Sequence, residues 1–285
     1  METGAHLTGM RVTSLRVLVF ASALLLCQAG SGAVQELVPQ HDDEVVEVLP
    51  AVTRNRPAPA TMAAPKADVP ALLQQVRADI GVALQTGDTR YWGRAQALLA
   101  PWWDKADAPA DLAVLQATVQ QGRHEFDAAR HVLEATLARS PNHAQGWLNL
   151  ASLERLQGAY EAAKHACDAV ARAGAEFYAL ACQLETRSLK GEQAAAEAGL
   201  QRLVQRSHDA GQQAWLMSLL AESLERSGQD AAALSAYRGS LKRDPDLYTA
   251  IALGDLLLRT GKPSEAISVV SGLPETDAVL LRRAA

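Results

Sequence analysis

The strongest constraint on the fold of this 285-residue chain is a repeat of about 34 residues that begins near residue 70. Two sets of alanines recur at intervals of 34 residues, namely Ala83, Ala117 and Ala151, and Ala95, Ala129 and Ala163. One set of aromatic residues follows the same interval: Trp92, Phe126 and Tyr160. Because three independent classes of position share one period, the sequence predicts stacked copies of one small unit, each in contact mainly with its neighbours.

The composition indicates that these units are helical. The chain is 48% hydrophobic but only 5% aromatic, and much of its apolar fraction is alanine, which has a high helix propensity. Strands prefer β-branched and aromatic residues, so a β-sandwich or barrel is disfavoured. The formal charge of −5 and the lack of a basic stripe argue against nucleic acid as a partner.

One copy of the repeat is more complete than the others. It carries Trp147, Leu150 and Ala151 on its first helix, Gly158 in the turn and Ala163 on its second helix. These residues resemble the tetratricopeptide repeat family, whose 34-residue unit is a helix-turn-helix. The resemblance covers about residues 70–277 and implies an all-α fold, an α-solenoid of about six tetratricopeptide-like repeats with a degenerate first copy.

Small residues at the helix crossings give this pattern its physical meaning. Where a side chain is only a methyl group, two helix backbones approach closely, and leucines and aromatic residues fill the wider spaces. The positions that define the repeat are Ala83, Ala95, Ala117, Ala129, Trp147, Ala151, Ala163, Ala233, Gly254 and Ala266.

Residues 1–33 are predicted to be a secretory signal peptide. Arg11 and Arg16 precede an apolar run over residues 17–27, and small residues follow as far as Ala33. The run is too short to span a bilayer permanently, and no later stretch approaches eighteen consecutive apolar residues. We therefore expect export to the periplasm of a Gram-negative bacterium and no integral membrane span.

A lipid anchor at Cys27 is the alternative for this segment. Bacterial lipoprotein signals carry a small residue directly before the modified cysteine. Here that position is Leu26, so cleavage near Ala33 is favoured over lipidation.

The remainder of the chain divides into three parts. Residues 34–68 are rich in proline, which prevents helix formation and predicts a flexible linker. A second interpretation is that the run at residues 45–49 is a short motif that pairs with a sheet edge of a partner or covers a groove of the protein itself. The solenoid is predicted over residues 69–277, and a partial capping helix over residues 278–285.

Two cysteines fall on helices that the repeat places side by side. Cys167 lies on the second helix of one repeat and Cys182 on the first helix of the next. Exported proteins meet an oxidising compartment, so a disulfide between them is expected. The alternative is a pair of buried free thiols at small apolar positions.

The sequence contains no combination of residues that is typical of catalysis. It has no glycine-rich phosphate loop, no H-E-x-x-H pair and no G-x-S-x-G elbow. His131 and Glu134 have the helical spacing of two metal ligands, but no third ligand is evident nearby. We expect no catalytic residues, no metal, no cofactor and no enzymatic activity.

The family resemblance implies that the first helix of each repeat lines a concave surface that holds peptides or partner helices. The exposed positions of these helices give the candidate partner-binding groove: Asn149, Ser152, Arg155, Tyr178, Glu185, Trp215, Ser218, Glu222, Tyr248 and Asp255. Tyr178, Trp215 and Tyr248 occupy the same slot in consecutive repeats, where aromatic side chains would anchor a peptide. The alternative is that these rings pack between repeats.

One kind of groove is disfavoured. Chaperone-binding members of the family hold a C-terminal carboxylate with asparagine and basic residues at set positions of successive first helices. Asn149 fits one such position, but Leu115 and Cys182 occupy the equivalent positions on either side, so this clamp is incomplete.

These observations together predict a non-catalytic scaffold or adaptor for protein–protein interaction in the bacterial cell envelope. It would bind a peptide or helix of a protein partner in the concave groove. The alternative is an accessory chaperone or assembly factor for an envelope or secretion complex.

Overall fold

The computed structural model describes residue 41 and residues 68–284. The predicted signal peptide, Cys27 and the motif at residues 45–49 lie outside the described residues. All the helices described belong to one compact unit. Their bounds are α1 (Val69–Thr86), α2 (Arg90–Leu99), α3 (Ala110–Gly122), α4 (Phe126–Arg139), α5 (Ala144–Leu156), α6 (Tyr160–Arg172), α7 (Glu176–Leu189), α8 (Gln193–Arg206), α9 (Ala210–Arg226), α10 (Asp230–Arg243), α11 (Leu247–Arg259), α12 (Pro263–Val270) and α13 (Asp277–Ala284).

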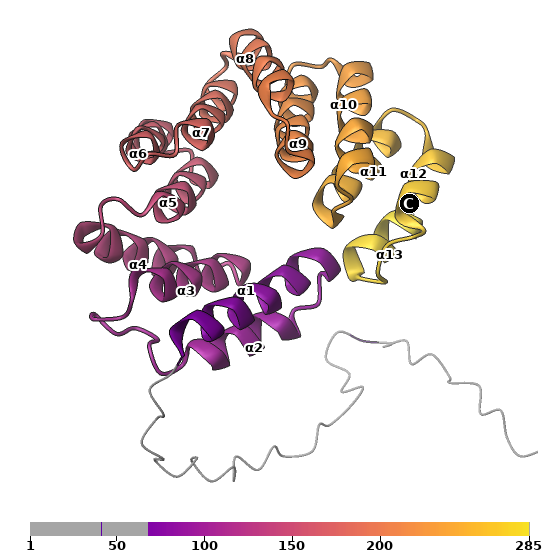
Figure 1. Cartoon of the computed structure of the whole chain (residues 1–285). Helices are drawn as coiled ribbons and strands as arrows, with labels where there is room; N and C mark the ends of the chain where they lie inside the picture. Colours follow the sequence, from indigo (N-terminus) through magenta and orange to yellow (C-terminus); the bar gives the residue numbers. More distant parts are fainter. Residues whose placement is uncertain (1–40, 42–67, 285) are drawn as a thin grey trace, which may run out of the picture. The chain divides into compact units, whose positions relative to one another are not determined.

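The helices form consecutive pairs that stack on one another. Each odd-numbered helix from α1 to α11 packs against the even-numbered helix that follows it, and each pair contacts the next (Figure 1). Residues 68–284 contain no strand. The predicted all-α solenoid of six repeats is confirmed, and α13 packs against the last pair, α11 and α12.

The alanines of the repeat lie at the centre of this packing. Ala151 and Ala163, on the paired helices α5 and α6, are both completely buried. The other alanines that define the repeat are buried as well: Ala83, Ala95, Ala117, Ala129, Ala233 and Ala266. A Cβ atom at Gly254 would lie 3.4 Å from Cγ1 of Val270 on α12, so α11 and α12 are in van der Waals contact at that glycine. Because one pair exposes its outer apolar faces, the core is continuous only through stacking.

Trp147 has a different role from the alanines. Its ring is partly buried against the cluster that contains Leu150 and Leu153. Its indole Nε1 donates a hydrogen bond of 2.8 Å to the carbonyl of Pro141, in the loop before α5. This residue therefore fixes the entry of the chain into the third repeat.

The turn inside each repeat requires a left-handed backbone conformation. Gly158, between α5 and α6, has a φ of 73°, and glycines stand in the matching turns of the later repeats. In the second repeat His124 takes this place with a φ of 62°. An L-residue with a side chain adopts this conformation at a cost in energy, which explains why glycine is the rule at this position.

The first helix pair also contacts the end of the array. The helices curve round so that α1 lies beside α11 (Figure 1). At this seam Gly87 caps α1 with a φ of 68°. A Cβ atom at Gly87 would lie 2.8 Å from Cγ2 of Thr276 and 3.5 Å from Cδ2 of Leu247. The sequence repeat predicts contacts between neighbours only, so this contact was not predicted.

The seam can be tested with two glycine substitutions that differ in their surroundings. Gly158→Ala has only the cost of a left-handed alanine, about 1–2 kcal/mol, because nothing lies within 4 Å of the added methyl group. Gly87→Ala adds the same cost and also a clash with Thr276. We expect urea unfolding to show a larger loss of stability for Gly87→Ala, and small-angle scattering to show a larger radius of gyration. Equal losses and equal radii would mean that the seam does not form in solution.

Candidate functional site

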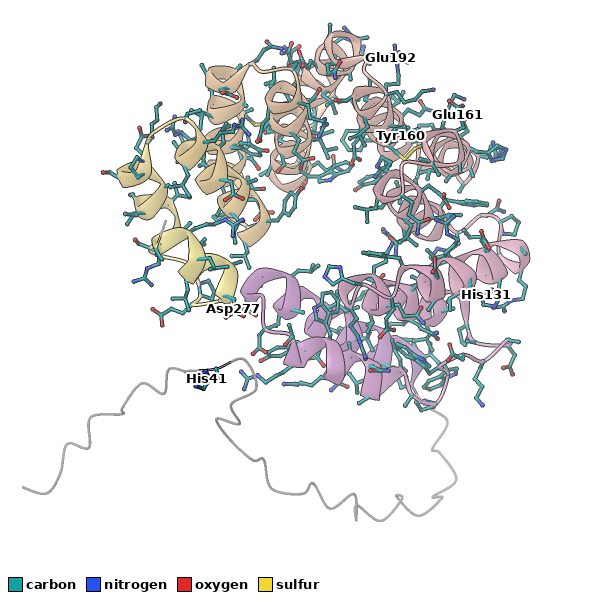
Figure 2. The ribbon with its side chains drawn as sticks, turned by 180° about the vertical axis from the view of Figure 1, so that it is seen from behind. His41, His131, Tyr160, Glu161, Glu192 and Asp277 are labelled. Carbon is teal, nitrogen blue, oxygen red and sulfur yellow. A yellow bond between two sulfur atoms is a disulfide. The ribbon has the colours of Figure 1, made fainter. Side chains whose placement is uncertain are left out.

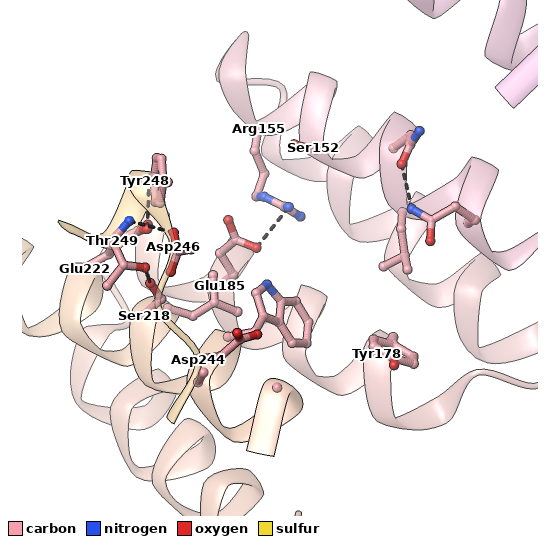
Figure 3. Close-up of a pocket in the computed structure, with 17 residues that line it drawn as sticks. Ser152, Arg155, Tyr178, Glu185, Ser218, Glu222, Asp244, Asp246, Tyr248 and Thr249 are labelled. Carbon is pink, nitrogen blue, oxygen red and sulfur yellow. Dashed lines mark hydrogen bonds and ion pairs between the residues drawn. The ribbon is translucent and has the colours of Figure 1, made fainter. Parts of the chain in front are cut away.

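The inner side of the array contains a cavity of about 620 Å³ (Figure 3). Its walls come from the first helices of four consecutive repeats, α5, α7, α9 and α11, and from the loop between α10 and α11. The cavity is lined by Gln145, Leu148, Asn149, Ser152, Arg155, Tyr178, Glu185, Gly211, Ala214, Trp215, Ser218, Leu219, Glu222, Asp244, Asp246, Tyr248 and Thr249.

Nine of the ten residues predicted for the groove line this one cavity. The exception is Asp255, whose carboxylate accepts two hydrogen bonds from Arg282 of α13, the shorter of them 2.6 Å. Asp255 therefore holds the capping helix. Whether the other nine residues bind a partner stays a prediction.

Two acidic residues of the cavity were missed by the sequence analysis. Asp244 and Asp246 lie in the loop that precedes α11, and the prediction considered only positions on the helices. Asp246 is the N-cap of α11, and its carboxylate accepts a hydrogen bond of 2.8 Å from the backbone N–H of Thr249. An aspartate directly before a helix is a common capping signal, which could have placed this residue.

The three aromatic side chains share one position in the repeat geometry. Tyr178, Trp215 and Tyr248 each precede the glycine of their turn by the same number of residues, so they project from matching points of α7, α9 and α11. Their exposed fractions are 38%, 37% and 65%. The rings of Tyr178 and Trp215 contact each other, with centroids 5.8 Å apart. These exposures place the rings on the inner surface and not in the core between repeats.

Two carboxylates lie deep in the cavity. Glu185 forms an ion pair of 2.9 Å with Arg155. Glu222 accepts a hydrogen bond of 2.9 Å from the hydroxyl of Tyr248 and has Arg226 at 3.7 Å. Both side chains are only about a fifth exposed, at 19% and 20%. Figure 3 shows Arg155, Glu185, Glu222 and Tyr248 around the same opening.

Burial changes the ionisation of these groups. Loss of hydration raises the pKa of Glu185, against the opposing effects of Arg155 and Arg226. Burial likewise raises the pKa of Glu222, and the nearby charge of Glu185 raises it further, whereas the Tyr248 hydroxyl and Arg226 lower it. The pKa of Tyr248 is raised chiefly by burial and then by Glu222, so its hydroxyl remains protonated and continues to donate.

Two polar residues of the predicted groove are committed to bonds within the protein. The Ser218 hydroxyl lies 2.7 Å from the Thr249 hydroxyl, a contact that joins α9 to α11. The Asn149 amide donates to Thr118 at 2.9 Å and accepts from Gln145 at 2.8 Å. These contacts join neighbouring first helices along the cavity wall. Because the Asn149 amide already has partners on both sides, it is not free to hold the carboxylate of a ligand as in the chaperone-binding clamp.

A disulfide lies directly behind this wall. Cys167 of α6 and Cys182 of α7 are joined, with their Cα atoms 5.6 Å apart (Figure 2). Arg155 donates a hydrogen bond of 3.4 Å to the sulfur of Cys182. The same arginine pairs with Glu185, so the disulfide supports the helices that position this ion pair.

Neither a metal cluster nor a membrane-spanning helix is found in the described part of the chain. In residues 68–284 no group of three or more His, Cys, Asp or Glu side chains is placed to hold a metal ion. Among the helices of that same region, none combines the length and the hydropathy that crossing a membrane requires.

The stacked helix pairs and the lined inner surface are those of an α-solenoid repeat protein. Residues 114–176 and residues 218–277 match the family model described as tetratricopeptide repeat. These two segments are therefore tetratricopeptide repeats, as the alanine and glycine pattern of the chain implies. No curated protein matches the sequence.

Solved structures share this fold at low sequence identity. TTC0263, a thermophilic TPR protein of Thermus thermophilus, gives a TM-score of 0.52 at 19% identity, over 66% of this chain and 99% of that chain. PilW, described as a widely conserved type IV pilus biogenesis factor, gives a TM-score of 0.50 at 14% identity, over 74% of this chain and 97% of that chain. At these identities the similarity shows the fold alone.

The disulfide predicts a specific pattern of thiol reactivity. When the protein is denatured without reductant, Cys167 and Cys182 should resist alkylation, and after reduction both should react. Reduction should also lower the free energy of unfolding by about 3 kcal/mol, since the bond closes a loop in the unfolded chain. Mass spectrometry of the alkylated peptides checks the first outcome and urea unfolding the second. Alkylation of both residues without reductant would contradict the bond.

The raised pKa of Glu222 predicts a stabilising substitution. The Glu222 carboxyl binds its proton more tightly in the folded state than in the unfolded chain, so its ionisation at pH 7 destabilises the fold. This destabilisation disappears as the pH falls below about 4.5, the pKa in the unfolded chain. We expect Glu222→Gln to raise the melting temperature at pH 7 and to leave it unchanged near pH 4.

Glu161 provides the matched control. It lies on the outer face of α6 (Figure 2), where a hydrogen bond from Lys190 lowers its pKa. Glu161→Gln should give no stabilisation at either pH. A lower melting temperature for Glu222→Gln at pH 7 would mean that the contacts of this carboxylate outweigh its desolvation.

Proposed function

We propose that the protein is a non-catalytic scaffold or adaptor of the bacterial cell envelope, which binds a peptide or helix of a partner protein in the cavity of α5, α7, α9 and α11. The observation that carries this proposal is the row of exposed aromatic rings, one from each of three consecutive repeats, on the wall of an open cavity. Exposed tyrosine and tryptophan side chains in a concave site are the residues that most often dominate binding energy.

The form of the cavity supports a polypeptide ligand. Its lining residues come from four repeats in succession, so a ligand that fills it contacts several repeats at once. A peptide can place one side chain against each repeat, because matching positions recur along the array. Arg155 holds the Glu185 carboxylate in place, and the Tyr248 hydroxyl holds that of Glu222. Both carboxylates are therefore already oriented before a ligand binds.

Two features support an envelope location. The first is the predicted signal peptide at residues 1–33, with cleavage near Ala33 favoured over lipidation at Cys27. The second is the disulfide between Cys167 and Cys182, because such bonds persist in oxidising compartments and are rare in the cytosol of most bacteria. The periplasm is reached through a signal peptide and is oxidising, so both features fit a protein of that compartment.

The proposal can be tested by affinity capture with a groove variant and a matched control. Trp215→Ala removes one exposed ring of the cavity, and Leu156→Ala removes an apolar side chain that is 67% exposed but lies outside it. Quantitative mass spectrometry should show at least a roughly tenfold loss of the captured partner for Trp215→Ala, and no loss for Leu156→Ala.

The captured proteins also separate the two functional hypotheses. A stable partner in a fixed ratio supports a scaffold, whereas a varied set of unfolded clients supports an accessory chaperone or assembly factor. Capture that Trp215→Ala leaves unchanged would contradict binding in the cavity.

A further inference from the structure

The charges on the cavity wall are unbalanced. Among the described residues that line the cavity, four are carboxylates, from Glu185, Glu222, Asp244 and Asp246, and Arg155 is the cationic one. Arg226 approaches Glu222 at 3.7 Å from outside the lining. The site therefore presents an excess of negative charge to whatever enters it.

Part of this negative charge remains available to a ligand. Arg155 pairs with one oxygen of Glu185, Oε2, and no hydrogen bond from residues 68–284 reaches the other oxygen. The Asp244 carboxylate likewise has no side-chain partner within that region. Glu185 and Glu222 repel each other across the cavity, as the effect of Glu185 on Glu222 indicates. A cation between them would relieve this repulsion.

Aromatic rings line the same cavity as these carboxylates. Figure 3 shows Tyr178 and Tyr248 around the same opening as Glu185, Asp244 and Asp246. Trp215 contacts Tyr178 and also lines the cavity. Aromatic rings attract cations through their negative faces, and indole does so most strongly.

On the basis of the proposed function, we infer that the cavity binds an arginine side chain of the partner peptide, with its guanidinium between the carboxylates and the aromatic rings. A guanidinium is planar, donates to two carboxylate oxygens at once and stacks on aromatic faces, and it sheds water more readily than an ammonium group. A ligand carboxylate would meet an excess of negative charge here, because Arg155 already pairs with Glu185 and four carboxylates line the cavity.

The first experiment identifies the ligand chemistry directly and does not require the partner protein itself. A displayed library of random peptides is selected on the full-length protein, and binders that also bind the Trp215→Ala variant are removed. We expect the remaining peptides to share an arginine at one position. Trp215-dependent peptides without a shared basic residue would overturn this inference and leave the proposed function intact. The absence of any Trp215-dependent peptide would overturn both.

The second experiment tests the contact itself. A selected peptide is synthesised with blocked ends, and a second version carries citrulline, a neutral isostere, in place of arginine. Calorimetry should show a loss of affinity of about tenfold or more on this exchange, and a similar loss for Glu222→Gln with the arginine peptide. The two changes together should cost little more than either alone, because they remove the same interaction.

Two controls make the result decisive. Glu161→Gln removes a carboxylate outside the cavity and should leave affinity unchanged. The melting temperature of Glu222→Gln shows whether any loss of affinity comes from unfolding of the variant. If Glu222→Gln is folded and binds the arginine peptide with full affinity, the inference is wrong. Retention of full affinity when lysine replaces arginine would overturn the assignment to a guanidinium.

Discussion

Close approach of two helix backbones at an alanine is the interaction on which the rest of the structure depends. Ala151 and Ala163 are completely buried, so α5 and α6 meet at the distance that a methyl group allows. The same small residues recur in the other pairs, and each pair therefore has nearly the same shape. Equal shape lets the pairs stack in register, which in turn aligns Tyr178, Trp215 and Tyr248 on one surface.

What the sequence predicted and what it missed follow from this periodicity. Positions tied to the repeat, such as Ala151, Gly158 and Trp215, could be placed because each copy of the unit repeats the same local geometry. Asp244 belongs to a loop between repeats, and no periodic pattern specifies where a loop side chain lies. The contact of Gly87 with Thr276 depends on the curvature summed over all repeats, a quantity that no single copy encodes.

The cavity also shows how a site can weaken the fold that holds it. Glu185 and Glu222 lose most of their hydration, and the ion pair and hydroxyl contacts that they make do not fully replace it. Contacts behind the cavity offset this cost, such as the buried hydroxyl pair of Ser188 on α7 with Ser223 on α9 at 2.7 Å, and the disulfide. The side chains that stabilise the fold and those of the candidate site are thus different residues of the same helices.

The seam between α1 and α11 has a consequence for the binding proposed above, because it joins the first repeat to the last. An open solenoid accepts a ligand sideways, along the whole length of its groove. Here the first repeat closes that side, so the aromatic row faces a bounded interior. A partner bound there as proposed would have to enter end-on, as a chain terminus or a narrow helix, unless the seam separates first.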